Sequence, residues 1–309
     1  MKVGYVGLIG RPNVGKSTLL NNILGQKVAI ISDKPQTTRI SILGIKTTQK
    51  GQIIFVDNPG IHKPLHRLNK RMMNFVHSSL ETSDLVNLLI DATQKFGHGD
   101  QFVIDTLKNI STPIILLINK VDIVKKENVL LIIDQYKDLL DFKEIIPISA
   151  LKGTNIDVLE EKIYDFLPDA EKIYADDEIS DQSQRFLLSE IIREKLLSHV
   201  RKELPFVTAV YIDMIEDRVK HKRSDASSPD SASVKEEKMK YIRASIFVER
   251  DTHRKIVIGK HAHLIKAIGT QARQEMEQIL GMKVFLDLAV KVKAKWRDSP
   301  DVLDLIEGQ

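Results

Sequence analysis

The feature that most constrains this chain is a complete G-x-x-x-x-G-K-S motif, which runs from Gly10 to Ser17. The apolar run Val3–Ile9 precedes it, and a helix-like stretch, Ser17–Leu24, follows it. A strand that leads through a glycine-rich turn into a helix directs several backbone N–H groups at one point, and the helix dipole favours an anion there. The motif therefore predicts a phosphate-binding loop for a nucleoside triphosphate, with the lysine on the outer phosphates and the serine hydroxyl on Mg²⁺. The residues expected to form this part of the site are Gly10, Asn13, Val14, Gly15, Lys16, Ser17 and Thr18.

The rest of the first half alternates apolar strands with helical segments. Strands are expected at Ile53–Asp57, Leu85–Asp91, Ile114–Asn119 and Ile145–Ser149, and helices near His66–Ser79, Asp100–Ile110, Asn128–Leu140 and Asn155–Leu167. This alternation is typical of an α/β domain with a mostly parallel, doubly wound sheet. The segments Ser41–Thr48 and Gln52–Asp57 flank a tight turn and predict an antiparallel hairpin at one edge. Ligands of such sheets bind at the carboxyl ends of the strands.

A second motif, Asn119-Lys-Val-Asp122, directly follows the apolar run Ile114–Ile118. The carboxylate of Asp122 is able to accept two hydrogen bonds from guanine, and a polar site left unpaired by the wrong base discriminates by about 10⁴–10⁵. Lys120 is expected to pack on the base and brace the phosphate loop, while Asn119 holds the neighbouring loops. Ser149 and Ala150 end the next strand, where their backbone meets the guanine carbonyl. Together these motifs favour guanine, with an adenine nucleotide as the alternative.

Between these motifs lie the residues expected to sense the terminal phosphate. Asp57-Asn-Pro-Gly60 closes a strand, which places the carboxylate near Mg²⁺ and the Gly60 N–H near the terminal phosphate. The loop Ser32–Arg39 offers a threonine that binds Mg²⁺ only while that phosphate is present, which makes the loop a switch. Thr38 is preferred to Thr37 for this role. The expected metal ligands are Ser17, Thr38 and Asp57, and the expected catalytic residues are Lys16, Thr38 and Gly60.

One catalytic part is absent from the motif that closes at Gly60. Many GTPases place a glutamine after this glycine to orient the attacking water, but here the position is Ile61. His62 and His66 lie nearby, although surface histidines usually have no such role. Slow intrinsic hydrolysis is therefore expected, with help from a partner worth about 10³–10⁵. Asn13 is a candidate ligand for a monovalent cation such as K⁺.

Charge and composition narrow the class of protein further. The chain has no cysteine, which excludes disulfides and cysteine-based zinc sites, and no apolar run near the roughly 18 residues of a membrane span. A soluble, cytoplasmic protein is expected. The formal net charge is +4, and the segment from Arg254 to Arg297 contains ten basic residues and three acidic residues. This concentration predicts a polyanionic partner for the second half of the chain.

The second half is expected to form a separate domain. An acidic segment, 169–182, is predicted to link a domain spanning 1–168 to one spanning 183–309. In the second domain a helix near 184–202 precedes two strands, Phe206–Glu216 and Lys240–Arg250, with a low-complexity Ser/Asp-rich insertion near 218–238. A G-K-H-A turn, the helix Thr270–Leu280 and a last strand, Val284–Lys295, follow.

This order of elements resembles a type II, α+β K-homology domain, in which a G-x-x-G turn clamps about four single-stranded nucleotides. The last strand alternates lysines with apolar residues, which predicts three ammonium groups on one face. The second glycine of the turn is replaced by Ala262, whose methyl group hinders close approach of the backbone. The residues expected to contact RNA are Ile258, Gly259, Lys260, His261, Ala262, Ile265, Lys266, Arg273, Lys291, Lys293 and Lys295.

The complete set of motifs resembles the Era family of bacterial GTPases. The resemblance includes the phosphate loop, Q-T-T-R, D-x-P-G-I-H-K-P, N-K-V-D, Ser-Ala, the helix-forming segment Ser183–Leu196 and V-I-G-K, so it covers nearly the whole chain. It implies a cytoplasmic, monomeric GTPase that uses GTP, GDP and Mg²⁺. Its implied partners are the 3′ end of small-subunit ribosomal RNA and the small ribosomal subunit, whose maturation it assists, with peripheral contact at the inner membrane. The alternatives are a GTP-fuelled RNA-processing enzyme, a membrane-signalling GTPase and a second domain that docks only protein.

Overall fold

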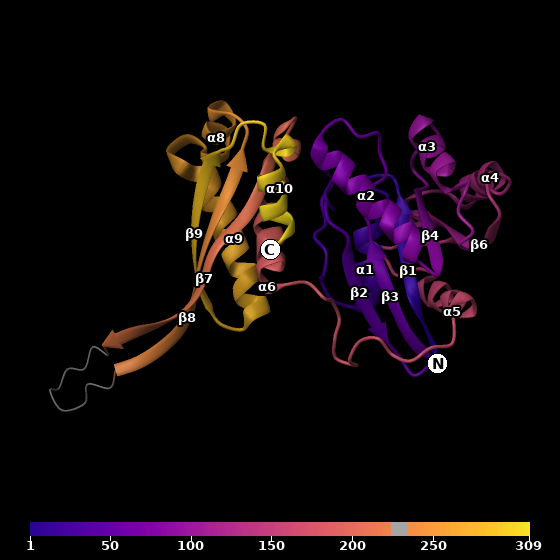
Figure 1. Ribbon diagram of the computed structural model, residues 1–309, viewed down its shortest axis with the longest axis horizontal. Coiled ribbons are helices and arrows are strands. Elements are labelled where there is room, and N and C mark those ends of the chain that lie inside the picture. The colour runs from indigo at the N-terminus through magenta and orange to yellow at the C-terminus, as the bar shows by residue number, and fades with distance from the viewer. Residues whose placement is uncertain (224–233) are drawn as a thin grey trace. The chain divides into compact units, whose positions relative to one another are not determined.

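The computed structural model describes residues 1–223 and 234–309, with the backbone alone at 220–223 and 234–237. The described chain divides into two compact units, Met1–Gln182 and Ser183–Gln309, each with its own sheet (Figure 1). No helix in these described ranges is both long enough and apolar enough to cross a membrane. The class predicted from the sequence, an α/β phosphate-loop GTPase domain followed by an α+β K-homology domain, is confirmed.

The N-terminal unit is built on a six-stranded sheet in the order β2-β3-β1-β4-β5-β6. Only β2 is antiparallel to its neighbour, and it lies at the edge, as the hairpin predicted. The parallel strands are nearly all apolar because helices cover both of their faces. The strands are β1 (Lys2–Gly10), β2 (Ile42–Thr47), β3 (Gly51–Asp57), β4 (Leu85–Asp91), β5 (Ile114–Asn119) and β6 (Phe142–Pro147).

The helices of this unit cover the two faces of the sheet in separate groups. One core cluster joins β1, β4 and β5 to α2, α3 and α4, and includes Val76, Ile104 and Tyr136. On the other face, Gly44 of β2 lets α1 approach closely, and Lys46 pairs with Glu160 of α5 at 2.5 Å. The helices are α1 (Lys16–Leu24), α2 (Arg67–Thr82), α3 (His98–Leu107), α4 (Lys126–Tyr136) and α5 (Ile156–Phe166), with a 3₁₀ turn η1 at Val121–Ile123.

The segment 169–182, expected to be a linker, is attached to the N-terminal unit by hydrogen bonds. The edge strand β2 donates from Ile45 N to Ile179 O at 2.8 Å, and Ser180 Oγ donates to Leu43 O at 2.7 Å. The side chain of Gln52 donates to Tyr174 O at 2.9 Å. These contacts satisfy backbone groups that the edge of the sheet otherwise leaves unpaired.

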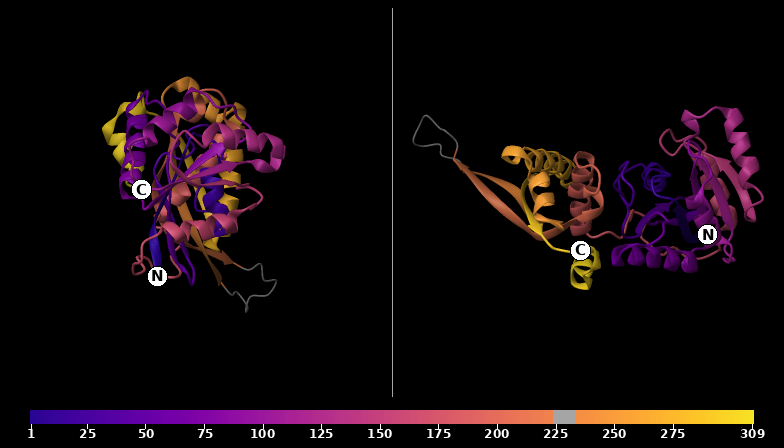
Figure 2. Two further views of the ribbon diagram at one scale, coloured as in Figure 1. Left: turned by 90° about the vertical axis from the view of Figure 1, so that its right-hand side faces the viewer. Right: turned by 90° about the horizontal axis from the view of Figure 1, so that it is seen from above.

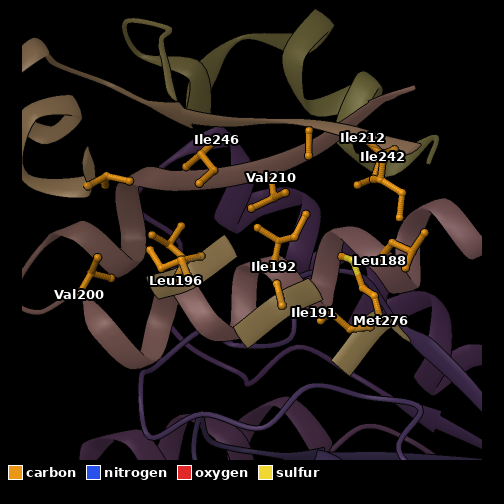
Figure 3. Packing of buried hydrophobic residues seen from close by; sticks show 14 of the residues in the cluster. Leu188, Ile191, Ile192, Leu196, Val200, Val210, Ile212, Ile242, Ile246 and Met276 are labelled. Atoms are coloured by element: carbon orange, nitrogen blue, oxygen red, sulfur yellow. The ribbon is translucent and has the colours of Figure 1, made fainter. Parts of the chain in front are cut away.

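The C-terminal unit packs helices on one face of a three-stranded sheet in the order β7-β8-β9. Strands β7 and β8 are antiparallel, whereas β8 and β9 are parallel. Leu188, Ile192 and Leu196 of α6 meet Ile212 and Ile246 of the strands in a buried core (Figure 3). The elements are α6 (Gln184–His199), α7 (Leu204–Val207), β7 (Thr208–Arg223), β8 (Val234–Val248), α8 (Asp251–Ile258), η2 (Lys260–Ala262), α9 (His263–Leu280), β9 (Lys283–Val292), η3 (Trp296–Asp298) and α10 (Pro300–Glu307).

Two strands of this unit are longer than the sequence pattern indicated. The strands expected at Phe206–Glu216 and Lys240–Arg250 continue as a paired ribbon to Arg223 and from Val234, so both reach into the segment 218–238 that is expected to hold an insertion (Figure 2). The pairing reaches this far because a ladder needs only backbone hydrogen bonds, which the apolar pattern does not reveal. The remainder of the expected insertion, 224–233, lies outside the described residues. The helix α10 was not predicted at all.

The last strand also ends earlier than the sequence pattern indicated. Strand β9 stops at Val292, and Lys295 adopts a left-handed conformation with φ 51°. The cause is Trp296, which is buried and donates its indole N–H to Val207 O at 2.9 Å. Although Lys293 N still donates to Val248 O at 2.8 Å beyond the end of the strand, the left-handed turn at Lys295 ends the alternation of side chains before that residue. The prediction of three lysines on one face of a continuous strand is therefore wrong.

Candidate functional site

The phosphate loop connects the carboxyl end of β1 to the first turn of α1. Gly15, at the N-terminus of this helix, has φ 103°, and a Cβ here would lie 2.3 Å from the side-chain nitrogen of Asn119. Lys16 folds back over the loop and donates to Gly10 O at 3.3 Å and to Arg11 O at 3.0 Å. Burial lowers the pKa of Lys16 to about 8, while the charge of Asp57 opposes this shift. The loop therefore holds a desolvated ammonium group where an anion would be strongly bound.

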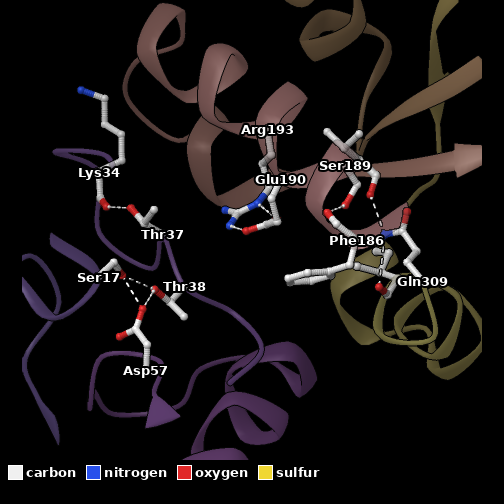
Figure 4. Close-up of polar contacts among 12 residues, drawn as sticks. Ser17, Lys34, Thr37, Thr38, Asp57, Phe186, Ser189, Glu190, Arg193 and Gln309 are labelled. Carbon is white, nitrogen blue, oxygen red and sulfur yellow. Dashed lines mark hydrogen bonds and ion pairs between the residues drawn. The ribbon is translucent and has the colours of Figure 1, made fainter. Parts of the chain in front are cut away.

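The side chains of Ser17, Thr38 and Asp57, which all carry oxygen atoms, meet at one point (Figure 4). Ser17 Oγ donates to Asp57 Oδ2 at 2.5 Å and lies 3.0 Å from Thr38 Oγ1. Thr38 Oγ1 also donates to the same carboxylate oxygen at 3.4 Å. The three residues come from the start of α1, the loop before β2 and the end of β3. The structure therefore brings together the three residues expected to hold the metal.

The chemistry of this cluster suits Mg²⁺. Hydroxyl and carboxylate oxygens are the ligands that this small, hard cation prefers. Asp57 Oδ1 is buried and has no hydrogen-bond partner among the described residues. Burial raises the pKa of Asp57 to about 6, although Lys16 and the two hydroxyl groups act against this shift. A divalent cation would supply the positive charge that the buried carboxylate lacks.

The base-recognition motif lies at the ends of β5 and β6. Asn119 links three loops: its Nδ2 donates to Val14 O at 2.7 Å, and its Oδ1 accepts from Lys120 N and Ala150 N, both at 2.8 Å. Ser149 Oγ donates to Asp122 Oδ1 at 2.7 Å, which orients the exposed carboxylate. A carboxylate held in this way is able to receive the two N–H groups of guanine.

Lys120 crosses from this motif to the phosphate loop. Its Nζ donates to Asn13 O at 3.0 Å and pairs with Asp91 Oδ2 at 2.6 Å. Asp91 is a site residue that the sequence analysis missed. The available signal was its position as the last residue of an apolar strand, the same signal that pointed to Asp57. The bridge fixes the lysine stem between the expected base and phosphate positions.

A cavity of about 470 Å³ opens over these elements. Its wall contains many of the expected nucleotide residues, namely Asn13, Gly15, Lys16, Ser17, Thr18, Thr38, Gly60 and Lys120. It also contains residues of the named motifs that had no assigned role, namely Pro12, Ser32, Asp33, Gln36 and Thr37, and residues outside those motifs, namely Ile30, Ile31, Asp91 and Gln94. Asp122, Ser149 and Ala150 are not part of this wall. Gly10 and Val14 contribute backbone carbonyls that hold Lys16 and Asn119.

The residues that follow Gly60 do not place a polar side chain for the attacking water. Ile61 is buried, and its backbone N–H donates to Gly10 O at 3.0 Å. His62 Nδ1 lies 2.7 Å from Gly60 O, and its Nε2 lies 2.7 Å from Asn69 Nδ2 and 3.1 Å from Gln36 Nε2. With both ring nitrogens occupied, His62 stabilises the loop rather than facing the cavity.

A second hollow, of about 520 Å³, lies between α9 and β9 in the C-terminal unit. Gly269 permits this close packing, since a Cβ here would lie 3.3 Å from Leu288. Of the residues expected to contact RNA, Ile265, Lys266 and Arg273 line the hollow. Arg273 is held by Glu277 at 3.0 Å. The other lining residues are Gly269, Thr270, Phe285, Leu286 and Leu288.

The remaining RNA candidates fall into two groups. Residues 258–262 form the turn before α9, in which Gly259 has φ 75°, His261 φ 51° and Ala262 φ 58°. Lys260 is exposed in this turn. Lys291 lies in β9 at a position of the opposite parity to the core residues and is 3.5 Å from Asp213, so it faces away from the helices. The basic face predicted for the last strand therefore does not border the hollow.

Comparison with known proteins agrees with this geometry. Residues 5–120 match the family described as 50S ribosome-binding GTPase, and residues 231–297 match the KH domain family. A crystal structure of Era with MgGDPNP and nucleotides 1506–1542 of 16S ribosomal RNA is 42% identical, with 99% of this chain and 98% of that chain covered and a TM-score of 0.89.

A second crystal structure, of an Aquifex aeolicus Era variant bound to GDP·AlF₄⁻, is also 42% identical. It covers 99% of each chain with a TM-score of 0.87. Both matches extend over the two units, including the segment 169–182. The similarity therefore includes the order of the two domains as well as the fold of each domain. The chain belongs to the Era family of GTPases.

Proposed function

We propose that this chain is a GTP-dependent switch that binds the 3′ end of small-subunit ribosomal RNA and assists maturation of the small ribosomal subunit. The observation that carries the proposal is the meeting of Thr38 with Ser17 and Asp57 within 3.0 and 3.4 Å. A loop that supplies one ligand to a shared cation is held more firmly while the cation and its phosphate are present, and is released after hydrolysis. GTP and GDP then stabilise different loop conformations.

Each part of the nucleotide site has a distinct task in this proposal. Lys16 exchanges its contacts with loop carbonyls for the outer phosphates, and Asp122 receives the guanine base. When bound through Ser17, Thr38 and Asp57, Mg²⁺ neutralises the charge that develops on the phosphates during hydrolysis. The Gly60 N–H is proposed to bind the terminal phosphate, which is consistent with the place of Gly60 in the wall of the cavity.

Hydrolysis by the chain alone is expected to be slow. Ile61 is buried at the position where many GTPases have a glutamine that orients water. Both ring nitrogens of His62 are engaged in hydrogen bonds, with Gly60 and with Asn69. We propose that a partner raises the rate, an effect worth about 10³–10⁵ when it supplies a charged stabiliser. We also propose that K⁺ raises the rate of hydrolysis by binding at Asn13. The side-chain Nδ2 of this residue donates to Asp33 O at 2.6 Å, which leaves the side-chain oxygen Oδ1 for a cation. Comparing hydrolysis in K⁺ and Na⁺ buffers tests the second point.

RNA binding is assigned to the C-terminal unit. The related Era structure contains nucleotides 1506–1542 of 16S ribosomal RNA, which supports the same class of RNA here. The wall of the hollow between α9 and β9 combines the apolar residues Ile265, Leu286 and Leu288 with the cations Lys266 and Arg273, a combination that suits single-stranded RNA. The turn at Gly259–Ala262 is proposed to hold the RNA backbone at the start of α9.

The cellular setting follows from this assignment. We propose a monomer that acts in the cytoplasm on the small subunit and touches the inner membrane only peripherally. The exposed lysines at 291, 293 and 295 support weak attraction to anionic lipid. Sedimentation with anionic and neutral vesicles tests the membrane contact, and light scattering tests the oligomeric state.

The decisive experiment measures binding of a labelled single-stranded RNA that matches the 3′ end of small-subunit ribosomal RNA. Binding is compared between the GTP-analogue and GDP forms, over a salt series, with a scrambled RNA as control. The proposal predicts sequence-dependent binding that changes with the nucleotide and a log–log salt slope of about −0.7 for each phosphate contacted. Equal affinity in both nucleotide forms would contradict the switch, and equal affinity for both RNAs would contradict the RNA assignment.

A further inference from the structure

A stack of three side chains crosses the sheet of the C-terminal unit on the face away from the helices and ends at the edge strand β9, which lines the hollow. Tyr241 of β8 and Phe285 of β9 are paired in register, and their rings are 5.6 Å apart with an interplanar angle of 12°. On the other side of Tyr241, the guanidinium carbon of Arg218 lies 3.6 Å from the ring centroid. The order across the sheet is therefore Arg218, Tyr241 and Phe285.

Polar contacts fix the inner members of the stack. The Tyr241 hydroxyl donates to Asp287 at 3.0 Å and accepts from Arg243 Nη2 at 2.9 Å. Arg218 is held in place by Glu216 at 2.8 Å. With these partners Tyr241 is buried to 7% exposure and is not available to a ligand. The inner part of the stack is thus preorganised before any ligand binds.

The outer member differs because β9 is the edge strand. Within the described ranges 1–223 and 234–309, no further strand pairs with β9 on its outer side, and Phe285 is 53% exposed. The same residue lines the hollow together with Lys266 and Arg273. Its ring projects from the face of the sheet opposite Leu286 and Leu288, at the edge strand that forms one wall of the hollow. A large exposed aromatic ring at the end of a rigid stack is a surface on which nucleobases stack.

We infer that Phe285 is a stacking platform for one nucleobase of the bound RNA, in addition to the turn at Gly259–Ala262. This inference rests on the proposed RNA-binding function and adds a residue to it. Stacking on an aromatic ring tolerates any base because every base presents a π-face. Phe285 therefore contributes affinity at one nucleotide position without specifying which base stands there.

The test pairs variants of the full-length protein with RNA that lacks a single base. Phe285→Leu removes the π-face but keeps apolar volume, and Phe285→Tyr retains the ring. Val292→Ala on the same strand, at a residue 40% exposed, is the matched control. Each protein is titrated with the ribosomal RNA 3′-end sequence and with a set of RNAs that are abasic at successive positions. Thermal unfolding verifies that each variant is folded.

Phe285→Leu is expected to weaken RNA binding by about 10- to 100-fold, the usual range for loss of base–aromatic stacking. Phe285→Tyr and Val292→Ala should bind as the wild type does. At one RNA position the abasic change should weaken binding to the wild type by a similar factor, yet cause no further loss in Phe285→Leu. Such non-additivity at a single position identifies the base that stacks.

Two results would overturn the inference in distinguishable ways. If the wild type binds the RNA and Lys266→Ala weakens it, but Phe285→Leu binds normally, then the platform is refuted and the RNA function stands. Additive losses at every abasic position would refute the platform in the same way. If the wild type binds the ribosomal and scrambled RNAs equally weakly, the RNA assignment and the platform fall together.

Discussion

Replacing Ala262 by glycine measures the strain in the turn before α9. Ala262 has φ 58° and ψ 24°, which is the left-handed region. The left-handed conformation raises the free energy of a residue with a Cβ by about 1–2 kcal/mol, whereas for glycine the increase is close to zero. Glycine also gains conformational freedom in the unfolded chain, which costs about 0.5–1 kcal/mol of stability. The net effect of Ala262→Gly is therefore expected to be stabilisation by about 0.5 kcal/mol.

A second alanine-to-glycine substitution serves as a control for the effect of glycine on the unfolded chain. Ala267→Gly makes the same chemical change inside the right-handed helix α9, where it should destabilise the unit by about 1 kcal/mol. Because the unfolded-state contribution is common to both variants, the difference between them reports the strain directly. The expected difference is about 1–2 kcal/mol, with Ala262→Gly the more stable protein.

Trp296 provides a probe that is specific to the C-terminal unit. It is the only tryptophan in the chain and is 1% exposed, so its fluorescence follows unfolding of that unit. For a urea slope of about 2 kcal/mol per molar, the two midpoints should differ by about 0.5–1 M. If Ala262→Gly lowers the midpoint as much as Ala267→Gly, the argument from backbone strain is refuted. Closer approach of the RNA backbone should also tighten RNA binding by Ala262→Gly, which the same RNA titration measures.

At the nucleotide site, Mg²⁺ binding requires ionised Asp57, whose pKa burial raises to about 6. Apparent Mg²⁺ affinity, followed with a fluorescent nucleotide, should be constant above about pH 7 and fall roughly tenfold per unit below pH 6; no decline would contradict the raised pKa. Without Mg²⁺, the folded protein binds a proton at Asp57 more tightly than the unfolded chain does, because the folded-state pKa lies above the ordinary value of 3.8. The resulting contribution to the free energy of unfolding is fully present below pH 3.8 and is lost as pH rises through about 6. Asp57→Asn should flatten that dependence in a pH series of urea unfolding. Asp122→Asn should weaken GTP binding by at least about 10²-fold and favour xanthosine triphosphate in competition titrations, and unchanged base preference would exclude Asp122 from recognition. Ser17→Ala should lower Mg²⁺ affinity by about tenfold or more while GDP still binds in EDTA, and equal Mg²⁺ affinity would remove Ser17 from the metal site.

Much of the nucleotide site was predictable because its residues lie in short, contiguous motifs. The turn Gly10–Ser17 has its effect through adjacent backbone N–H groups, so its chemistry depends on local conformation alone. The apolar strands Leu85–Asp91 and Ile114–Asn119 begin and end where the sequence indicated. Since parallel strands place their carboxyl ends at one edge, Asp57 and Asn119 were expected to lie close to the loop.

The C-terminal unit was less predictable at the ends of its elements. Strand β9 stops at Val292 because the chain turns to bury Trp296. The indole N–H of this residue donates a hydrogen bond to the backbone carbonyl of Val207, which lies 89 positions earlier. Strands β7 and β8 run on to Arg223 and from Val234 because their backbones pair, although their side chains carry no continuous apolar pattern. Neither boundary is encoded by the periodicity of the segment in which it occurs.

The sequence by itself determined the chemistry of the nucleotide site: a phosphate loop, a guanine motif and oxygen ligands for a cation, each carried by neighbouring residues. Tertiary structure alone decided which distant groups support that chemistry, such as Asp91 beneath Lys120 and Asn119 against Val14. It also decided that Phe285 completes a stack with Tyr241 and that Lys291 lies on the face of the sheet away from the helices. The physical reason is that motifs act through local backbone geometry, whereas these contacts depend on strand register and on which side chains the core has room to bury.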